Sequence, residues 1–274
     1  MKLLHFTDIH LTTPGDTIAD RDPNANFEAA LDHALARHAD AEALIVTGDL
    51  SDWGDREDYV RLRDRLARLP MPAHLCVGNH DDPAAFLTVF PELADENGFV
   101  QHAFALSRGT GLALDTTAPR THAGAFCAAR AAWLEARLSE GDGPFWLFLH
   151  HNPVPTGVPP CDEIMLLDAE RLGEVVARHA DRIAHIFFGH CHQPLCGSFH
   201  GVPFSAPRGT NHAGFANFGE TRKLTRSELP EAYGVVLASD AQVMVHMIEF
   251  KAEADLAAEG SPNWADWTRG EMAR

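Results

Sequence analysis

Cysteine is scarce in this sequence. The five cysteines are an odd number, and no two of them have Cys-x-x-Cys spacing. They stand at Cys76, Cys127, Cys161, Cys191 and Cys196. This excludes both a disulfide framework and a thiolate zinc site as the organising feature of the fold. For Cys191, which lies between two histidines, an extended backbone predicts a buried apolar role, because its side chain would point away from both neighbours.

Long apolar segments are also missing. No apolar run approaches the roughly 20 residues that cross a bilayer, and the apolar part of the first eight residues is too short for a secretory signal. The N-terminus instead predicts a strand that begins almost at once. We therefore expect a cytoplasmic protein without membrane contact.

Basic residues are few, at 22 Lys and Arg against 39 Asp and Glu, which gives a formal net charge of −17. Such a surface repels a polyphosphate, so the sequence argues against binding to a nucleic acid duplex. Histidine, in contrast, is abundant, with 17 residues. Because histidine is the commonest metal ligand and a frequent acid–base group, the positions of these residues carry the functional information.

Short apolar runs alternate with helical patterns along most of the chain. Runs typical of buried strands occupy residues 3–6, 43–46, 74–77, 145–149 and 183–188. Apolar residues at helical spacing predict helices over residues 24–38, 56–69, 128–138 and 168–179. Alternating strands and helices indicate a mostly parallel sheet that is covered by helices.

Further strands are predicted outside this alternation. Residues 104–106 and 112–114 form a predicted antiparallel pair, and four more strands follow at 197–200, 202–205, 233–238 and 242–250. Together these elements predict an α/β fold, a four-layer αββα sandwich of two mixed β-sheets flanked by helices, with a small C-terminal extension.

The chain is expected to form one domain over residues 1–250. Within it, residues 207–230 are polar and glycine-bearing, and a long loop inside a compact domain is usually functional. Residues 251–274 form an acidic, tryptophan-bearing tail that is expected to pack on the body or to mediate oligomerisation.

Polar side chains follow five of the predicted strands at the point where each strand ends. The residues concerned are Asp8, His10, Asp49, Asn79, His80, His150, His151, His190 and His192. Any single cluster of this kind is more often a turn that satisfies its own backbone. Ligands of open α/β sheets bind at the carboxyl ends of the strands, so five clusters in that context indicate a functional site.

The residue types at these strand ends indicate a metal centre. Asp8 and His10 are two residues apart, as are His190 and His192, so on an extended backbone each pair faces one side. Oxygen and imidazole donors without thiolate suit Mn, Fe, Zn or Co. Seven donors exceed the need of one tetrahedral ion, whereas two ions about 3.5–4 Å apart that share a carboxylate fit the number.

The order of these motifs resembles the five blocks of the calcineurin-like metallophosphoesterases. The blocks here are Asp8-x-His10, Gly48-Asp49, Gly78-Asn79-His80-Asp81, His150-His151 and Gly189-His190-x-His192. Within that superfamily, the opening Asp-Ile-His, the Gly-Asn-His-Asp-Asp block and the His-His-Asn-Pro block are most similar to bacterial glycerophosphodiesterases and class III cyclic-nucleotide phosphodiesterases. The resemblance covers residues 8–192 and extends to Gly209-Thr210-Asn211-His212.

The resemblance implies a role for each residue of the site. One ion would be held by Asp8, His10, Asp49 and His192, and the other by Asp49, Asn79, His150 and His190. Asp49 would bridge the two ions, and His80 would stabilise or protonate the leaving group. Asn79, His80 and His212 would contact substrate. Asp52 and His151 would support the ligands from behind, because strand alternation turns His151 away unless Pro153 kinks the chain.

The implied activity is that of a dinuclear metal-dependent phosphodiesterase. It would hydrolyse a small phosphodiester, either a glycerophosphodiester or a cyclic nucleotide, by attack of a metal-bridging hydroxide on phosphorus. Three alternatives stay open: a phosphomonoesterase, a nuclease of the same superfamily, and a non-catalytic metal-binding scaffold. A homo-oligomer is also possible.

Two residue types that are absent after Asp49 argue against two subfamilies of this superfamily. No arginine follows Asp49 closely, unlike in the protein Ser/Thr phosphatases of this superfamily, and no tyrosine stands there, unlike in purple acid phosphatases. The chain has only two tyrosines, Tyr59 and Tyr233. The missing arginine favours diesters over monoesters, unless Arg208 or Arg222 folds back to supply the cation.

Overall fold

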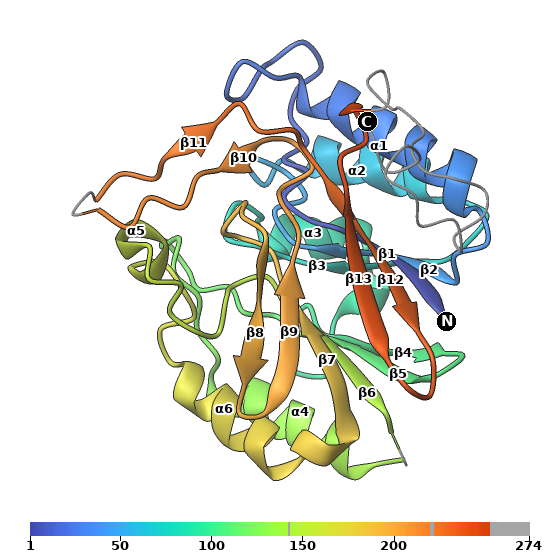
Figure 1. Ribbon diagram of the computed structural model, residues 1–274, viewed down its shortest axis with the longest axis vertical. Coiled ribbons are helices and arrows are strands. Elements are labelled where there is room, and N and C mark those ends of the chain that lie inside the picture. Colours follow the sequence, from blue (N-terminus) through green and yellow to red (C-terminus); the bar gives the residue numbers. More distant parts are fainter. Residues whose placement is uncertain (142, 220–221, 253–274) are drawn as a thin grey trace, which may run out of the picture.

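The computed structural model describes residues 1–141, 143–219 and 222–252. Its first sheet has five strands in the order β13-β12-β1-β2-β3 (Figure 1). The strands are β1 (Lys2–Phe6), β2 (Ala43–Thr47), β3 (Ala73–Cys76), β12 (Tyr233–Ala238) and β13 (Val243–Ile248). β1, β2 and β3 are parallel, whereas β12 and β13 are antiparallel to their neighbours, so the sheet is mixed.

The second sheet has six strands in the order β4-β5-β6-β7-β9-β8. They are β4 (His102–Leu106), β5 (Gly109–Ala113), β6 (Phe145–Phe148), β7 (Ile183–Phe187), β8 (Leu195–Phe199) and β9 (Val202–Ala206). The four central strands are parallel, and the two edge strands, β4 and β8, are antiparallel to their neighbours. The predicted antiparallel pairing of β4 with β5 is confirmed, but β5 is also parallel to β6.

Helices cover the outer face of each sheet. α1 (Pro23–His38), α2 (Arg56–Leu66) and α3 (Pro83–Val89) pack on the first sheet, and α4 (Ala128–Ser139) and α6 (Ala169–Arg178) pack on the second. Three hydrophobic cores separate the four layers, the middle one formed between the two sheets by residues such as Leu3, Ile45 and Phe148. The predicted αββα sandwich is therefore confirmed.

Strand β1 shows how the sequence produces these layers. Successive side chains of a strand point to opposite faces, so Leu4 and Phe6 join the core under the helices while Leu3 joins the core between the sheets. Both faces of β1 are buried, which explains why it has no polar alternation.

α3 was not predicted, although its start signal stands in the sequence. Asp82 accepts hydrogen bonds from the backbone N–H groups of Ala84 and Ala85, at 2.9 and 3.1 Å, and Pro83 occupies the first helical position. The helix is seven residues long, too short for a periodic pattern to appear. Three other short helical turns were also not predicted: 3-10 helices at Pro91–Leu93 and Ala180–Arg182, and α5 at Pro159–Asp162.

The segment 207–230 is more ordered than a loop. β10 (Ala213–Gly214) and β11 (Arg226–Ser227) pair in antiparallel fashion and form a ribbon that extends beside α5 (Figure 1). The predicted tail, except for Lys251 and Ala252, lies outside the described residues. Among the described helices, none has both the length and the apolar character needed to cross a bilayer.

Candidate metal centre

The parallel strands of both sheets end at the same edge of the sandwich. β1, β2 and β3 lead to the loops that carry Asp8, Asp49 and Asn79, and β6 and β7 lead to those that carry His150 and His190. Backbone hydrogen bonds join these loops to one another: Asp8 N–H donates to Gly48 at 3.1 Å, and Gly189 N–H donates to His150 at 3.0 Å. The loops therefore support each other as one rigid assembly.

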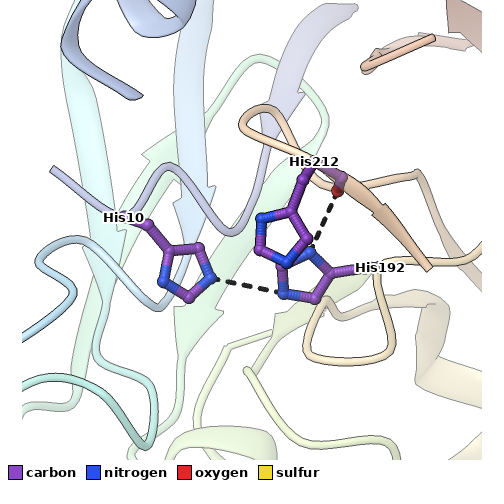
Figure 2. Close-up of side chains that lie close together, drawn as sticks. All are labelled: His10, His192 and His212. Atoms are coloured by element: carbon purple, nitrogen blue, oxygen red, sulfur yellow. Dashed lines mark hydrogen bonds between the residues drawn. The ribbon is translucent and has the colours of Figure 1, made fainter. Parts of the chain in front are cut away.

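Asp8, His10, Asp49 and His192 form the first group of donors. One ligand atom from each lies within 4.8 Å of the others. His10 Nε2 lies 3.3 Å from His192 Nε2 (Figure 2). His10 Nε2 also lies 3.7 Å from Asp49 Oδ2, and His192 Nε2 lies 3.4 Å from Asp8 Oδ1. These are the four residues that the resemblance implies as the ligands of one ion.

The second group surrounds the other oxygen of Asp49. His150 Nε2 lies 3.3 Å from Asp49 Oδ1 and 3.1 Å from Asn79 Oδ1, and the ring centroids of His190 and His150 are 5.1 Å apart. Asp49 thus directs Oδ2 toward the first group and Oδ1 toward the second. This is the position that a bridging carboxylate requires.

Four histidines of the site are anchored through one ring nitrogen each. His10 Nδ1 faces Asp52 Oδ1 at 3.0 Å. His150 Nδ1 faces the Thr47 carbonyl at 2.7 Å, and His192 Nδ1 faces the His212 carbonyl at 3.0 Å. Nε2 of His190 faces the Ile164 carbonyl at 3.0 Å. Each of these partners is an acceptor, so the ring proton points outward and the other nitrogen offers its lone pair to the centre.

With neutral imidazole rings, lone pairs therefore converge on the centre. His150 Nε2 faces both Asn79 Oδ1 and Asp49 Oδ1, and His10 Nε2 faces His192 Nε2 in the same way. Facing acceptors repel one another unless a cation lies among them. The outward hydrogen bonds are those that orient imidazole ligands in metal sites, so the residues present fit divalent metal ions.

The electrostatics of the site agree with this interpretation. Burial disfavours the imidazolium of His150, but the Asp49 carboxylate outweighs burial and raises the pKa of His150 to about 9. Burial alone would raise the pKa of Asp49, yet the neighbouring histidines hold it well below its usual value. The pKa of His190 lies well below its usual value because of burial and the nearby His150. The place beside Asp49 thus attracts positive charge, while His190 stays neutral and able to ligate.

The backbone reaches this arrangement through left-handed residues. Nine described non-glycine residues have positive φ, and five of them are predicted ligands: Asp8, His10, Asp49, His190 and His192. The expectation that each Asp-x-His and His-x-His pair lies on an extended segment is therefore wrong, since β1 ends at Phe6 and β7 at Phe187. Such conformations cost of order 1–3 kcal/mol each and cluster at functional sites.

Two glycines leave space that the candidate ligands fill. A Cβ on Gly48, which has φ +92°, would lie 2.4 Å from His150 Nδ1. A Cβ on Gly78 would lie 2.2 Å from Asp49 Oδ1. Both glycines belong to the motifs that carry the resemblance, and close packing against the ligands explains why no side chain fits at these positions.

His151 lies with His150 and His190 in a group of side chains that could hold a metal ion, but protein atoms contact both of its ring nitrogens. Its Nε2 faces the His122 carbonyl at 3.2 Å, so this nitrogen carries the proton, and its Nδ1 lies 2.8 Å from Thr116 Oγ1. Both ring nitrogens are therefore occupied. This contact pattern agrees with a supporting role, in which His151 packs against His190 at a centroid distance of 4.7 Å.

His80 and Asp52 lie on the pocket side of the first group. His80 Nδ1 lies 3.0 Å from the Asp52 carbonyl, and the His80 backbone N–H donates to Asp49 Oδ1 at 2.9 Å. Burial opposes protonation of His80, but the hydrogen bond to Asp52 and the charge of Asp49 prevail and raise its pKa to about 10. His80 is thus placed to hold a proton beside the centre.

His212 covers the first group from the ribbon side (Figure 2). Its ring centroid lies 4.1 Å from that of His192 and 5.4 Å from that of His10. Asn211 Nδ2 lies 3.3 Å from His212 Nδ1, which makes Nδ1 an acceptor and leaves the proton on Nε2. His212 also offers a ring nitrogen within 4.8 Å of those of His10 and His192, and it stays a predicted substrate contact.

Asp81 was given no role from the sequence, yet it supports the whole centre. Its buried carboxylate accepts hydrogen bonds from the backbone N–H groups of Leu50, Ser51 and Gly78 and from the Tyr59 hydroxyl, at 2.8–3.1 Å. It thereby fixes the loop that carries Asp49 to the loop that carries Asn79. The Gly-Asn-His-Asp motif, which ends at Asp81, was the feature of the sequence that could have indicated this role.

Replacing this carboxylate should destabilise the protein. We expect Asp81→Ala to lower the free energy of unfolding by about 3 kcal/mol or more, because several buried donors lose their only acceptor. Denaturant unfolding measures the change. The matched control is Asp82→Ala, which removes the cap of α3 and should cost about 1 kcal/mol. Equal effects of the two substitutions would contradict the supporting role.

His122 is a second residue that was given no role. It follows β5, and its Nδ1 lies 2.9 Å from Asn79 Nδ2. The strand-end argument would have found this loop if β5 had been recognised as parallel to β6, since its carboxyl end then lies at the same edge. His122 and Asn79 stand between two pockets: the metal-side pocket of about 510 Å³, which contains His10, Asp49 and His192, and a second pocket of about 860 Å³.

Comparison with known proteins agrees with the fold and the motifs. The family model described as calcineurin-like phosphoesterase matches residues 1–194. A probable cyclic nucleotide phosphodiesterase of Rhodopseudomonas palustris is 35% identical over 261 residues, which is 93% of this chain and 95% of that protein. A glycerophosphodiester phosphodiesterase of Enterobacter lignolyticus is 31% identical over 198 residues, covering 70% of this chain and 74% of that protein.

The fold also has a close counterpart among solved structures. A dimetal phosphatase from Danio rerio superposes with a TM-score of 0.68 over 91% of this chain and 96% of that one. The two sequences are only 13% identical. This likeness concerns the arrangement of the layers, whereas the sequence relatives above carry the information on family.

Proposed function

This chain belongs to the calcineurin-like phosphoesterases, and we propose that it is a metal-dependent phosphodiesterase that hydrolyses a small phosphodiester. Cyclic nucleotides and glycerophosphodiesters are the candidate substrates, because relatives that span most of the chain are named for these two classes. The proposed ligands are Asp8, His10, Asp49, Asn79, His150, His190 and His192.

The observation that carries the proposal is the direction of the ring protons. Each of the four anchored histidines points its N–H to an acceptor outside the centre and its lone pair inward. Acceptors that face one another in a buried place support a bound metal ion. His80, which lines the same pocket and holds a proton beside these acceptors, supports a metallohydrolase rather than a non-catalytic metal-binding scaffold.

The roles of the chain's own residues follow from their positions. Divalent cations in such a site supply positive charge to the phosphate oxygens and acidify water. His80, which lines the metal-side pocket and holds a proton, can donate that proton to the leaving alkoxide. His212, which lines the same pocket, can donate from Nε2 to a phosphate or ester oxygen. Asp52 keeps both His10 and His80 in place.

The experiment that tests the function is turnover of a substrate panel after reconstitution with Mn, Fe, Zn or Co. The panel contains cyclic nucleotides, glycerophosphodiesters, phosphate monoesters and a DNA duplex. Hydrolysis of small diesters that chelation abolishes and metal restores is the expected result. Activity confined to monoesters or to DNA would refute the proposal.

We expect kcat/KM to be higher for bis(4-nitrophenyl) phosphate than for 4-nitrophenyl phosphate at the same metal and pH. A monoester dianion needs an additional cation around its oxygens, and the loop after Asp49 brings Asp52 instead. Arg208 cannot supply the charge, because it donates to the Pro230 carbonyl at 3.1 Å and pairs with Glu249 at 2.5 Å. Steady-state kinetics with both esters measures the preference.

Arg222 is the control for this prediction. It lines the metal-side pocket, as Arg226 also does, and it pairs with Glu163 at 3.1 Å, so it is an arginine that can still reach a monoester. If Arg222 does so, Arg222→Ala lowers the monoester rate alone. A monoester that is hydrolysed about tenfold faster than the diester, or about 1.4 kcal/mol in transition-state preference, would replace the diesterase assignment by a phosphomonoesterase.

A further inference from the structure

The second pocket lies beside the metal centre and has no role in the reaction described above. It has a volume of about 860 Å³ and is called here the lateral cavity. Asn79 and His122 line both the lateral cavity and the metal-side pocket. The two pockets therefore adjoin at Asn79 and His122, and a molecule whose phosphate lies at the metal centre would pass these two residues to reach the lateral cavity.

The walls of the lateral cavity are largely apolar. Pro83, Ala84 and Leu87 of α3 form one side, and Phe99 and Pro119 form part of the other. Pockets of this size, with apolar walls and a few polar groups, bind molecules of drug size and not single small alcohols. A glycerol arm would leave most of this space to water and would gain little from the apolar walls.

Phe99 is held in a fixed orientation at the cavity. The Arg130 guanidinium carbon lies 4.3 Å from the Phe99 ring centroid. Arg130 is itself buried and fixed by the carbonyls of Thr117 and Ala125, both at 2.8 Å, and by Asp115 at 3.0 Å. The aromatic ring is therefore preorganised and loses little freedom when a flat group packs against it.

The charged groups of the lining are of two kinds. Asp81, Asp115 and Arg130 are buried in the walls and hydrogen-bonded within the protein, whereas two others stand at the edge of the cavity. Arg120 and Asp82 place one charge of each sign there, and both are exposed. A second phosphate would be repelled by Asp82, and a quaternary ammonium group by Arg120. A neutral ring with apolar faces and with donors and acceptors along its edge suits this arrangement, and a nucleobase has these properties.

We propose that the lateral cavity binds the nucleoside part of a phosphodiester whose phosphate lies at the metal centre. The inference rests on the proposed phosphodiesterase function and selects the nucleotide over the glycerol class of substrate. The base would pack among Phe99, Leu87 and Pro83, with its edge toward Arg120 and Asp82.

The test fills the cavity without touching the metal centre. Ala84 is exposed at the second position of α3 and lines the cavity, so Ala84→Trp occupies the space of the base. We expect kcat/KM for 3′,5′-cyclic AMP to fall by roughly tenfold or more, on the scale of one lost base-stacking contact. The value for glycerophosphoethanolamine should change less than about twofold, within the precision of such comparisons.

Ala129→Trp is the matched control. Ala129 is exposed at the second position of α4 and lines neither pocket described above, so both substrates should be unaffected. Calorimetry with adenosine, which has no phosphate, gives a readout that is independent of turnover. Adenosine should bind the wild type and the Ala129→Trp variant, and should fail to bind the Ala84→Trp variant.

Each outcome decides one of the two proposals. Equal losses for both substrates, no loss for cyclic AMP, or unchanged adenosine binding in Ala84→Trp would overturn the nucleoside site. A wild type that hydrolyses glycerophosphoethanolamine but neither hydrolyses cyclic AMP nor binds adenosine would overturn it too, while the phosphodiesterase function stands. Failure to hydrolyse any diester would refute the proposed phosphodiesterase function. Adenosine binding would then still test whether the lateral cavity binds a nucleoside.

Discussion

Asp49→Asn is expected to lower kcat/KM for a small diester by about 10³-fold or more, since it removes the charge that faces both groups of donors at once. In the structure, Oδ1 of Asp49 faces His150 and Oδ2 faces His10. Asparagine keeps an oxygen that can accept from the His80 backbone N–H, so the loop should retain its conformation. Elemental analysis after Mn titration should find two ions per wild-type chain and fewer in the variant.

Asp52→Asn is the matched control for Asp49. It changes a carboxylate that is hydrogen-bonded to His10 but does not face the second group. Loss of such a supporting partner typically costs 10–100-fold in metal affinity or activity, and excess Mn should restore part of it. An Asp49→Asn variant that keeps two ions, or that stays within about tenfold of the wild-type rate, would contradict the bridging role.

His80→Ala should lower kcat for an alkyl diester by about 10²–10⁴-fold, the usual contribution of general acid–base catalysis. The metal content should stay unchanged, because His80 stands outside both proposed ligand sets. His122→Ala is the comparison, since His122 also lines the metal-side pocket but contacts the Asn79 amide rather than a carboxylate. Its effect should be near tenfold, as for a residue that orients a ligand.

The leaving group distinguishes proton donation by His80 from a structural role. A 4-nitrophenolate leaves without protonation, so His80→Ala should affect bis(4-nitrophenyl) phosphate far less than a diester with an alkyl leaving group. A structural defect would slow both substrates alike. Equal losses for the two diesters would therefore remove His80 from the role of general acid.

The positions of the candidate ligands could be predicted because strand ends are visible in a sequence. Buried strands appear as short apolar runs, and each run here is followed by Asp, Asn or His. Parallel strands share the edge at which they end, so the convergence of Asp8 and Asp49 follows from the topology of the first sheet. His150 belongs to the second sheet and joins them because the two sheets pack with these strand ends at the same edge. The layer arrangement followed in the same way from alternating strands and helices.

The local conformation could not be predicted, because it depends on contacts that are distant in sequence. The left-handed backbone at His10 and His192 is imposed by neighbouring loops, such as the one that pairs His10 N–H with the Asp49 carbonyl at 2.8 Å. From the local sequence alone, an extended backbone is the expected conformation for both residues, because left-handed φ is rare outside glycine. The outward partners of the histidines, including the Ile164 carbonyl, come from segments with no recognisable motif.

The lateral cavity was missed for a related reason. The sequence predicts residues 112–114 only as half of an antiparallel pair, whereas β5 covers Gly109–Ala113 and its parallel neighbour β6 lies further along the chain. The loop that follows it, with Arg120 and His122, therefore had no assigned place. Pairing between strands separated by a helix is a tertiary choice that apolar runs alone do not encode.

The proposed ligands come from both sheets, and this has a consequence for the unfolding of the protein. Asp8, Asp49 and Asn79 follow strands of one sheet, whereas His150, His190 and His192 follow strands of the other. Cations bound by residues of both sets would link the two sheets at the edge where these strands end. Ligand binding is then linked to cooperative unfolding, because anything that binds only the native state stabilises it by mass action. Metal supply in the cell would thereby set the lifetime of the folded chain as well as its turnover.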